Sequence, residues 1–495
     1  MQLKELAGRI AASRIVGDGG VEFGGIQTDS RKVRPGDLFV CIPGFTQDGH
    51  DYAAEAAGRG AVALVAERET GAGLPFLLVK DSRRAMGLIA SHFYGYPSRQ
   101  LKLIGVTGTN GKTTVTFLID RILSDRGHRT GLLGTIHTKI AGEISAAERT
   151  TQEALDLQRV LRVMADRGVE YCTMEVSSHA LELGRVNGCR FRIALFTNLT
   201  RDHLDFHGTM ERYRDAKGLF FSRLGNDYGP DPGEDRFAVL NADDPVSEYY
   251  ARLTAAQIVT YGIEKSADVR ASEIRTTLSG TAFRLESFAG TAEIRMKLVG
   301  RFNVYNALAA AAAALAEGIP LEAVSGSLEA ADPVEGRMET VNAGQDFLVL
   351  VDYAHTPDGL ENALRSISEF AEGNVITVFG CGGDRDKTKR PIMGRIAAEY
   401  SDLVIVTSDN PRSEDPEAII RDIERGLLEA GFPKDRYRIM PDRREAIRAA
   451  VREAGRGDVV LIAGKGHETY QILRDRTIAF DDRTEAAEAI RSLDR

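Results

Sequence analysis

The sequence predicts an α/β protein of three domains. At roughly 150 residues per domain, its 495 residues allow about three. Short apolar strands alternate with helical stretches along most of the chain, as in sheets covered by helices. Between residues 268 and 299, apolar residues recur at every second position, which indicates antiparallel ribbons. We expect a small N-terminal α/β domain (1–97), a central domain with a mostly parallel sheet plus an antiparallel ribbon (98–334), and a C-terminal Rossmann-like α/β domain (335–495).

The composition narrows the class of protein. Lys and Arg (63) against Asp and Glu (72) leave a net charge of −9, which does not favour nucleic acid. The start, MQLKELAGRI, lacks the basic and apolar regions of a signal peptide, and the longest apolar run, 307–316, is too short to cross a bilayer. The four cysteines, Cys41, Cys172, Cys189 and Cys381, lie far apart and form no C-x-x-C pair. The sequence therefore favours neither a disulfide framework nor a zinc site. We therefore expect a cytoplasmic protein without a membrane span.

The first two segments show different patterns of strands and helices. In the N-terminal segment we expect a strand at 37–42, a helix at 50–60, and further strands at 61–65 and 75–79. Pro97 ends the segment. In the central segment, a buried strand at 101–106 leads through a Gly-rich turn into a helix at 115–123. Later elements of this segment are strands at 170–175, 193–197 and 237–240, and an Ala-rich helix at 304–317.

The C-terminal segment repeats strand, loop and helix. Its strands are expected to end at Val351, Phe379, Thr407, Met440 and Ala463. Charged residues and glycines concentrate in the loops that follow these strands. Because ligands of open α/β sheets bind outside the carboxyl ends of the strands, these loops are the candidate binding site of the segment.

The sharpest local motif is Gly108-Thr-Asn-Gly-Lys-Thr-Thr114, between a buried strand and a helix. It departs from a strict Walker A pattern, because Val106 stands where that pattern has glycine. The glycines still allow backbone N–H groups to surround phosphate oxygens, and Lys112 adds a point charge. Thr113 or Thr114 can offer a hydroxyl to Mg²⁺. We interpret the motif as a nucleotide-binding loop and not as an ordinary glycine turn.

Further motifs follow along the chain in a fixed order. They are Thr150-Thr151, Glu175-Val-Ser-Ser-His179, Asn198-Leu-Thr-Arg-Asp-His-Leu-Asp205, Ala216-Lys217, Gly300-Arg-Phe-Asn303, Asp352-Tyr-Ala-His355, Asp409-Asn-Pro-Arg412 and Gly464-Lys-Gly-His-Glu468. The ordered series resembles the Mur ligase and folylpolyglutamate synthetase superfamily. Within it, the series is similar to the ligases that join meso-2,6-diaminopimelate to UDP-N-acetylmuramoyl-L-alanyl-D-glutamate.

The resemblance implies an ATP-dependent amide ligase that uses Mg²⁺ and forms an acyl phosphate. Cations must neutralise charge when a carboxylate attacks a phosphate, and Mg²⁺ prefers hard oxygen ligands. The implied catalytic residues are Lys112, Glu175, His203 and Lys217. The implied metal ligands are Thr113, Thr114, Glu175, His203 and a carbamylated Lys217. The spacing of His203 and His207 could suggest zinc, but no third soft ligand lies nearby in the sequence.

The resemblance also implies which residues bind ATP and which bind the UDP-muramoyl-dipeptide. Implied ATP-binding residues are Gly108, Thr109, Asn110, Gly111, Lys112, Thr113, Thr114, Asn303, Arg337, Asp352 and His355. Arg337 would reach phosphate only after domain closure, and a simple interdomain ion pair is an equal alternative. Implied contacts to the UDP-muramoyl-dipeptide are Ser30, Thr150, Thr151, Ser177, Arg185 and His207. A capping or core role for His207 stays open. Leu183 and Phe45 replace a glutamine and a histidine that are common in the family.

The acceptor amino acid is the most specific expectation. The distal end of meso-diaminopimelate carries a carboxylate and an ammonium, which Arg412 and Glu468 can bind. The implied set is Arg385, Asp409, Asn410, Pro411, Arg412, Gly464 and Glu468. Alternatives are a lysine-adding sibling ligase, folylpolyglutamate synthetase, or a noncatalytic ATP-binding scaffold. We expect a monomer.

Overall fold

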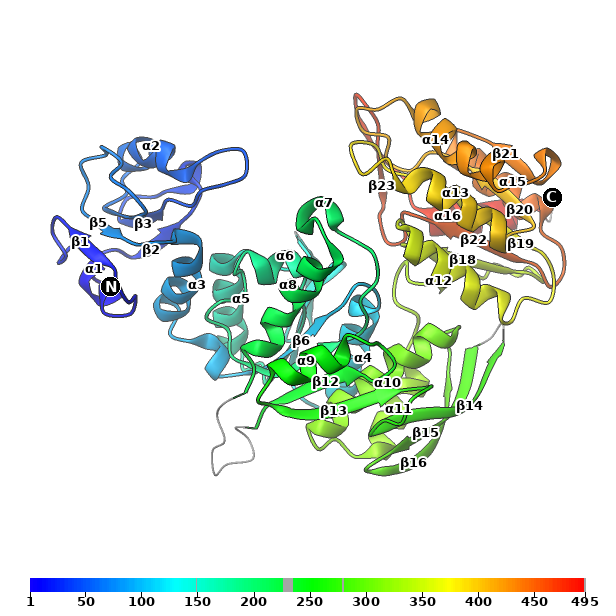
Figure 1. The fold of residues 1–495 in the computed structure, drawn as a ribbon, viewed down its shortest axis with the longest axis horizontal. Coiled ribbons are helices and arrows are strands. Elements are labelled where there is room, and N and C mark those ends of the chain that lie inside the picture. Colours follow the sequence, from blue (N-terminus) through cyan, green and yellow to red (C-terminus); the bar gives the residue numbers. More distant parts are fainter. Residues whose placement is uncertain (148, 226–234, 278–279, 494–495) are drawn as a thin grey trace.

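The computed structural model describes residues 1–147, 149–225, 235–277 and 280–493. Three α/β bodies follow one another along the chain, and the N-terminal body (blue) and the C-terminal body (yellow to red) lie on opposite sides of the central one (Figure 1). This confirms the expected fold class. Each main sheet lies within one of the three expected segments. The limits at 97 and 334 stay predictions.

The N-terminal sheet has the strand order β1-β5-β4-β3-β2. Its strands are β1 (Arg14–Val16), β2 (Gly25–Gln27), β3 (Asp37–Val40), β4 (Ala63–Ala66) and β5 (Phe76–Leu78), and its helices are α1 (Leu3–Ala7), α2 (Ala53–Gly58) and α3 (Ser82–Phe93). Neighbouring side chains of a strand point to opposite faces, so β3 contributes to two cores. Leu38 and Val40 pack in the core that includes α3, and Phe39 packs with α2.

The central sheet has the order β16-β15-β14-β13-β12-β11-β6-β10-β7-β8-β9. The strands from β7 to β14 in this order are parallel, and hairpins extend both edges. The parallel strands are β6 (Lys102–Thr107), β7 (Thr130–Leu133), β10 (Tyr171–Glu175), β11 (Phe191–Phe196), β12 (Phe237–Asn241), β13 (Gln257–Gly262) and β14 (Val269–Thr277). The others are β8 (His137–Ile140), β9 (Glu143–Ala146), β15 (Gly280–Ser287) and β16 (Gly290–Met296). The expected parallel sheet and antiparallel ribbon are confirmed.

Helices cover both faces of the central sheet. One core joins α4 (Lys112–Asp125), α10 (Arg301–Ala316) and α11 (Leu321–Ala330) to the sheet. The core of the other face includes α5 (Ala154–Asp166), α6 (Ser178–Glu182), α8 (Met210–Ser222) and α9 (Ser247–Leu253). The short helix α7 (Leu204–His207) precedes α8. Helix α10 is buried along most of its length, which its run of small alanine side chains allows.

The C-terminal sheet has the order β17-β18-β22-β19-β20-β21, and only β17 at its edge is antiparallel to its neighbour among the described strands. Its strands are β17 (Glu339–Thr340), β18 (Leu348–Asp352), β19 (Val375–Phe379), β20 (Leu403–Val406), β21 (Tyr437–Ile439) and β22 (Val459–Ala463). Helices α12 (Pro357–Ser368), α13 (Lys389–Tyr400) and α14 (Pro416–Glu429) cover one face, and α15 (Arg443–Glu453) and α16 (Asp482–Arg491) cover the other. A separate hairpin joins β23 (Tyr470–Ile472) and β24 (Thr477–Ala479). Each main strand ends within one residue of its predicted position.

No helix of the described ranges is both long enough and apolar enough to cross a membrane.

Candidate active site

The nucleotide-binding loop connects β6 to α4 at the carboxyl end of the central sheet. Gly108 and Gly111 have φ angles of +148° and +84°, which L side chains rarely adopt. A Cβ at Gly108 would lie 1.8 Å from Thr197 Oγ1, and a Cβ at Gly111 would lie 2.4 Å from Asn306 Oδ1. Both positions therefore require glycine.

Two lysines meet at this loop. Lys112 Nζ donates to the carbonyls of Gly108 (3.0 Å) and Thr109 (2.7 Å), and Lys217 Nζ, from α8, donates to the carbonyl of Gly108 (2.8 Å). Lys217 is 1% exposed. Burial and the nearby charge of Lys112 hold the pKa of Lys217 well below its ordinary value. Two amines close to one loop suit a polyanionic ligand, and a lowered pKa favours the neutral, nucleophilic form of Lys217.

Glu175, at the end of β10, is buried beside the loop. Its Oε1 accepts hydrogen bonds from Thr113 Oγ1 (3.1 Å) and from the Thr135 backbone (2.8 Å), and its Oε2 accepts from Thr135 Oγ1 (3.1 Å). The carboxylate at the end of β10 and the Thr113 hydroxyl in the first turn of α4 are buried oxygen donors, which fits a hard cation such as Mg²⁺. Among the described residues, no cluster of three or more His, Cys, Asp and Glu side chains could hold a metal. The cation site would therefore depend on hydroxyl, carbamate and water oxygens beside Glu175.

Aromatic residues surround His203 at the other edge of the loop. Its ring centroid lies 4.8 Å from that of His179 and 6.1 Å from that of Tyr213, whose hydroxyl is 3.1 Å from Thr109 Oγ1. Desolvation lowers the pKa of His203 below its ordinary value, and the neighbouring Asp202 carboxylate opposes this shift. His203 also has a positive φ of 55°, a strained backbone conformation that often marks functional sites. Neither His179 nor Tyr213 is among the site residues predicted from the sequence.

Most of the residues expected to bind the muramoyl-dipeptide gather beside Glu175. Thr151 Oγ1 donates to the Glu175 carbonyl (2.9 Å) and accepts from the Ser177 backbone (3.1 Å). Arg185 donates to the Thr151 carbonyl at 3.2 Å. Thr150 lies 3.0 Å from Thr135, hydroxyl to hydroxyl, and through Thr135 it is linked to the Glu175 carboxylate.

Two members of that set lie apart from this group. His207 is 5% exposed, and its Nε2 is 2.9 Å from Ser178 Oγ. Its burial favours the core role that the sequence left open. Ser30 lies in the N-terminal body, where its hydroxyl donates to Glu55 at 3.1 Å. Phe45, from the same body, is 78% exposed, and its ring lies 6.0 Å from that of Phe206 on α7.

Arg337 joins the central and C-terminal bodies. Its guanidinium donates to Thr113 Oγ1 at 3.2 Å and lies over the ring of Tyr353. It therefore already reaches the nucleotide-binding loop, and the expected closure is not needed to bring it there. Its Nε is buried and has no hydrogen-bond partner among the described residues. A ligand oxygen could satisfy this donor.

The other residues expected to bind ATP lie around this junction. Burial raises the pKa of Asp352 to about 6, and its Oδ2 accepts from the Met338 backbone at 2.7 Å. His355 Nδ1 is 2.8 Å from the Tyr353 carbonyl. Asn303 is 2% exposed and contacts the loop through Asn306, whose Nδ2 donates to Asn303 Oδ1 at 3.0 Å.

The residues expected to bind the acceptor come together at the carboxyl ends of β20 and β22. Asn410 Nδ2 donates to Glu468 Oε2 at 2.8 Å, and a Cβ at Gly464 would lie 2.8 Å from Asp409 Oδ2. Arg412 follows Pro411, has a φ of +53°, and donates to the Gly383 carbonyl at 2.9 Å. Lys465, which the sequence analysis did not select, lies among them.

Arg385 is more peripheral than the rest of that set. Its side chain is exposed in the loop after β19 and donates to the Asp384 carbonyl at 2.9 Å.

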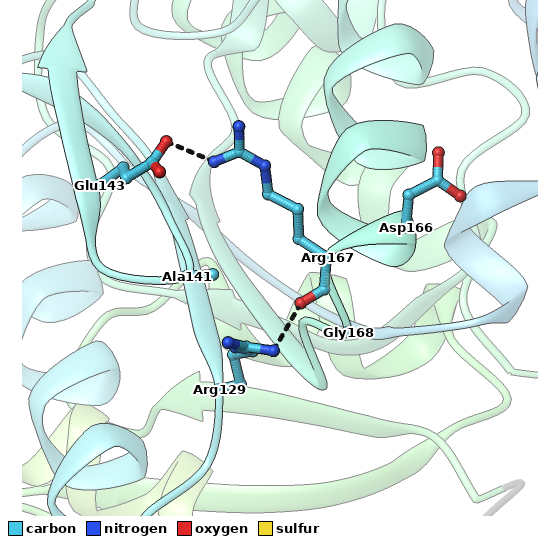
Figure 2. Close-up of a pocket in the computed structure, with 6 residues that line it drawn as sticks. All are labelled: Arg129, Ala141, Glu143, Asp166, Arg167 and Gly168. Atoms are coloured by element: carbon cyan, nitrogen blue, oxygen red, sulfur yellow. Dashed lines mark hydrogen bonds and ion pairs between the residues drawn. The ribbon is translucent and has the colours of Figure 1, made fainter.

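A pocket of about 470 Å³ lies elsewhere on the central body (Figure 2). It is lined by Arg129, Ala141, Glu143, Asp166, Arg167 and Gly168. Arg129 and Gly168 precede β7 and β10, so the pocket borders the amino ends of the parallel strands. The nucleotide-binding loop lies at the opposite, carboxyl ends, where ligands of such sheets bind. The pocket is therefore not the candidate active site.

Comparisons with known proteins agree with the three-body organisation. Family models match residues 22–94 ("Mur ligase family, catalytic domain"), 106–314 ("Mur ligase middle domain") and 336–466 ("Mur ligase, glutamate ligase domain"). The chain is 54% identical to the UDP-N-acetylmuramoyl-L-alanyl-D-glutamate–2,6-diaminopimelate ligase of Geobacillus kaustophilus over 99% of both chains. It is 52% identical to the protein of that name from Halalkalibacterium halodurans, again over 99% of both. A solved structure with that name is 34% identical, covers 100% of this chain and 99% of its own, and superposes with a TM-score of 0.71.

Proposed function

The chain belongs to the Mur ligase family, and we propose that it joins meso-2,6-diaminopimelate to UDP-N-acetylmuramoyl-L-alanyl-D-glutamate, converting ATP to ADP and phosphate. The observation that carries this function is the 54% identity to a ligase of that name over 99% of both chains. The lysines at the nucleotide-binding loop and the polar loops of the C-terminal sheet give the chemistry a physical basis. The enzyme is ATP-dependent, uses Mg²⁺ and acts in peptidoglycan precursor synthesis.

The first step brings two anions together. The glutamyl carboxylate attacks the γ-phosphorus of ATP, an acyl phosphate forms, and ADP leaves. Lys112 and Arg337 would oppose the repulsion, because Lys112 belongs to the loop that would hold the phosphates and Arg337 contacts Thr113 beside it. Thr113, Thr114, Glu175, His203 and Lys217 are the residues that would hold Mg²⁺. When bound, Mg²⁺ supplies further positive charge at the phosphoryl oxygens.

Lys217 is proposed to act as a carbamate. The neutral amine attacks the carbon of CO₂, one N–C bond forms and one proton leaves, so a neutral amine becomes an anion. The lowered pKa of Lys217 supports this, since only the neutral amine is nucleophilic. The carbamate would then offer oxygens to the cation site beside Gly108.

The second step forms the amide. The amine of the acceptor attacks the acyl carbon, phosphate leaves, and the nitrogen loses a proton. Thr150, Thr151, Ser177 and Arg185 are proposed to hold the muramoyl-dipeptide, with Ser30 and His207 as more distant members of that set. Thr151 and Arg185 support this arrangement because they lie beside Glu175, and thus beside the phosphate end of the site.

The acceptor is proposed to bind where the β20 and β22 loops meet. Arg412 would bind the distal carboxylate, and Glu468 would bind the distal ammonium. Asp409, Asn410, Pro411 and Gly464 would shape the pocket, with Arg385 at its edge. Asn303, Asp352 and His355 would complete the ATP site. We further propose that the enzyme is cytoplasmic and acts as a monomer.

One assay tests the function. Purified protein receives ATP, Mg²⁺ and the UDP-muramoyl-dipeptide, together with meso-diaminopimelate or L-lysine, and ADP release is followed. A parallel reaction contains a folate and glutamate. We expect turnover with meso-diaminopimelate alone. Equal turnover with lysine or turnover with folate would identify a sibling ligase, and no turnover with any acceptor would identify a noncatalytic scaffold.

A further inference from the structure

Lys465 is a buried cation at the centre of the loops expected to bind the acceptor. Its side chain is fully buried, and it is the second residue after the end of β22. Its Nζ donates to Asn410 Oδ1 at 3.0 Å and to Glu468 Oε2 at 3.1 Å, and it lies 3.7 Å from Asp409 Oδ1. One ammonium thus contacts polar side chains from two separate loops.

The contacts of Lys465 leave part of Glu468 available. Asn410 Nδ2 also donates to Glu468 Oε2, at 2.8 Å. Both described bonds therefore use the same carboxylate oxygen, and Oε1 can accept an ammonium of a ligand. Burying an ammonium is costly unless it is paired, so this position of Lys465 depends on the two carboxylates around it.

The charges of this cluster, taken together, select a class of ligand. Asp409 and Glu468 contribute two negative charges, and Lys465 and Arg412 contribute two positive charges, so the cluster is neutral. The distal end of meso-diaminopimelate is also neutral, because it carries one ammonium and one carboxylate. The distal end of L-lysine carries an ammonium alone and has a net charge of +1. A neutral cluster therefore matches the first ligand and not the second.

We propose that Lys465 is a specificity-determining positioning residue, which balances the charge of the acceptor pocket so that it accepts a zwitterionic distal end. This inference rests on the proposed function. It adds that the rejection of lysine depends on two residues: Arg412, which would bind the distal carboxylate, and Lys465, which pairs with Glu468. Without Lys465 the cluster would carry one net negative charge and would suit a lone ammonium.

The test compares two acceptors in Lys465→Met, whose side chain has a similar length without the charge. The ratio of kcat/KM for meso-diaminopimelate to kcat/KM for L-lysine is measured, together with the KM for ATP; where lysine gives no detectable turnover, the detection limit sets a lower bound on the ratio. We expect this ratio to fall at least tenfold, with KM for ATP changed less than twofold. Lys465→Arg, which keeps the charge, should retain most of the ratio. Lys434→Met removes an exposed lysine of the same body and should leave the ratio unchanged.

Several outcomes would overturn the inference. An unchanged ratio in Lys465→Met would contradict the inference: if kcat/KM fell equally for both acceptors, Lys465 would only support the loops, and if neither kcat/KM changed, its charge would be irrelevant. If Lys465→Met does not fold, Lys465→Gln is measured by the same criteria, because its amide can still hydrogen-bond to Glu468. The wild-type protein separates the two claims, since a wild type that does not use meso-diaminopimelate contradicts the proposed function itself.

Discussion

The carboxylate of Asp358, in the first turn of α12, accepts a hydrogen bond of 2.5 Å from Asn110 in the nucleotide-binding loop. The same oxygen accepts from Thr200 at 2.6 Å and from Asn362 at 3.1 Å. A side chain of the C-terminal body therefore holds the loop that would bind ATP. The helix N-terminus also favours a negative charge at this position.

We predict that Asp358→Ala loosens this junction. Losing a charged acceptor for buried donors costs about 1–3 kcal/mol, which corresponds to roughly 5- to 150-fold faster local opening. Hydrogen exchange measured by mass spectrometry should show this increase in peptides that contain Asn110 and in those that contain the first turn of α12. Glu361→Ala, on the same helix, is the control. Unchanged exchange near Asn110 in Asp358→Ala would show that the contact does not hold the loop.

Carbamylation of Lys217 predicts that activity depends on CO₂. Protein prepared in CO₂-depleted buffer should lose most of its ADP release, and added bicarbonate should restore it, because the anionic ligand forms again. Carbon-13 NMR with labelled bicarbonate should show a carbamate signal that is missing in Lys217→Ala. Full activity of CO₂-depleted protein without that signal would exclude the modification.

Arg412→Ala should act on the acceptor and not on ATP. Loss of a charged contact to a carboxylate costs about 2–4 kcal/mol, so KM for meso-diaminopimelate should rise roughly 30- to 1000-fold. Steady-state kinetics should show less than a twofold change in KM for ATP. Arg385→Ala is the matched comparison, and we expect a smaller effect because that side chain is exposed. An unchanged acceptor KM in Arg412→Ala would remove Arg412 from the site.

The strand positions could be predicted from sequence because each strand is an apolar run bounded by glycine, proline or charge. The β18, β19 and β22 ends follow from this pattern. The helix after the nucleotide-binding loop was expected at 115–123, but it begins at Lys112, because its first turn is formed by the polar end of the loop motif. The sheet order could not be predicted, because pairing depends on contacts between distant segments. β14, for example, pairs in parallel with β13 before it turns into the ribbon.

Site residues could be predicted where they belong to a recognisable sequence motif. Residues whose role depends on their burial in the folded protein could not be predicted. Lys465 stands inside the motif Gly464-Lys-Gly-His-Glu468, but the sequence does not distinguish a buried lysine from an exposed one. Asp358 reaches the loop, and Thr135 reaches Glu175, from segments far away in the chain, so no local pattern indicates them. Their short polar side chains would read equally well as helix caps or turn residues.

Asp352 predicts a pH dependence of stability. Burial raises its pKa from 3.8 to about 6, so between these values the folded protein binds more protons than the unfolded chain. The raised pKa therefore destabilises the fold above pH 6, and this cost disappears as the pH falls towards 4. Asp352→Asn lacks the cost, so its advantage in unfolding free energy over the wild type should shrink by about 1–3 kcal/mol from pH 7 to pH 4, measured by urea unfolding with circular dichroism. Asp346→Asn, at an exposed position in the same body, is the control and should show no such trend. If the difference in unfolding free energy between Asp352→Asn and the wild type were the same at pH 7 and pH 4, Asp352 would titrate like an ordinary carboxyl.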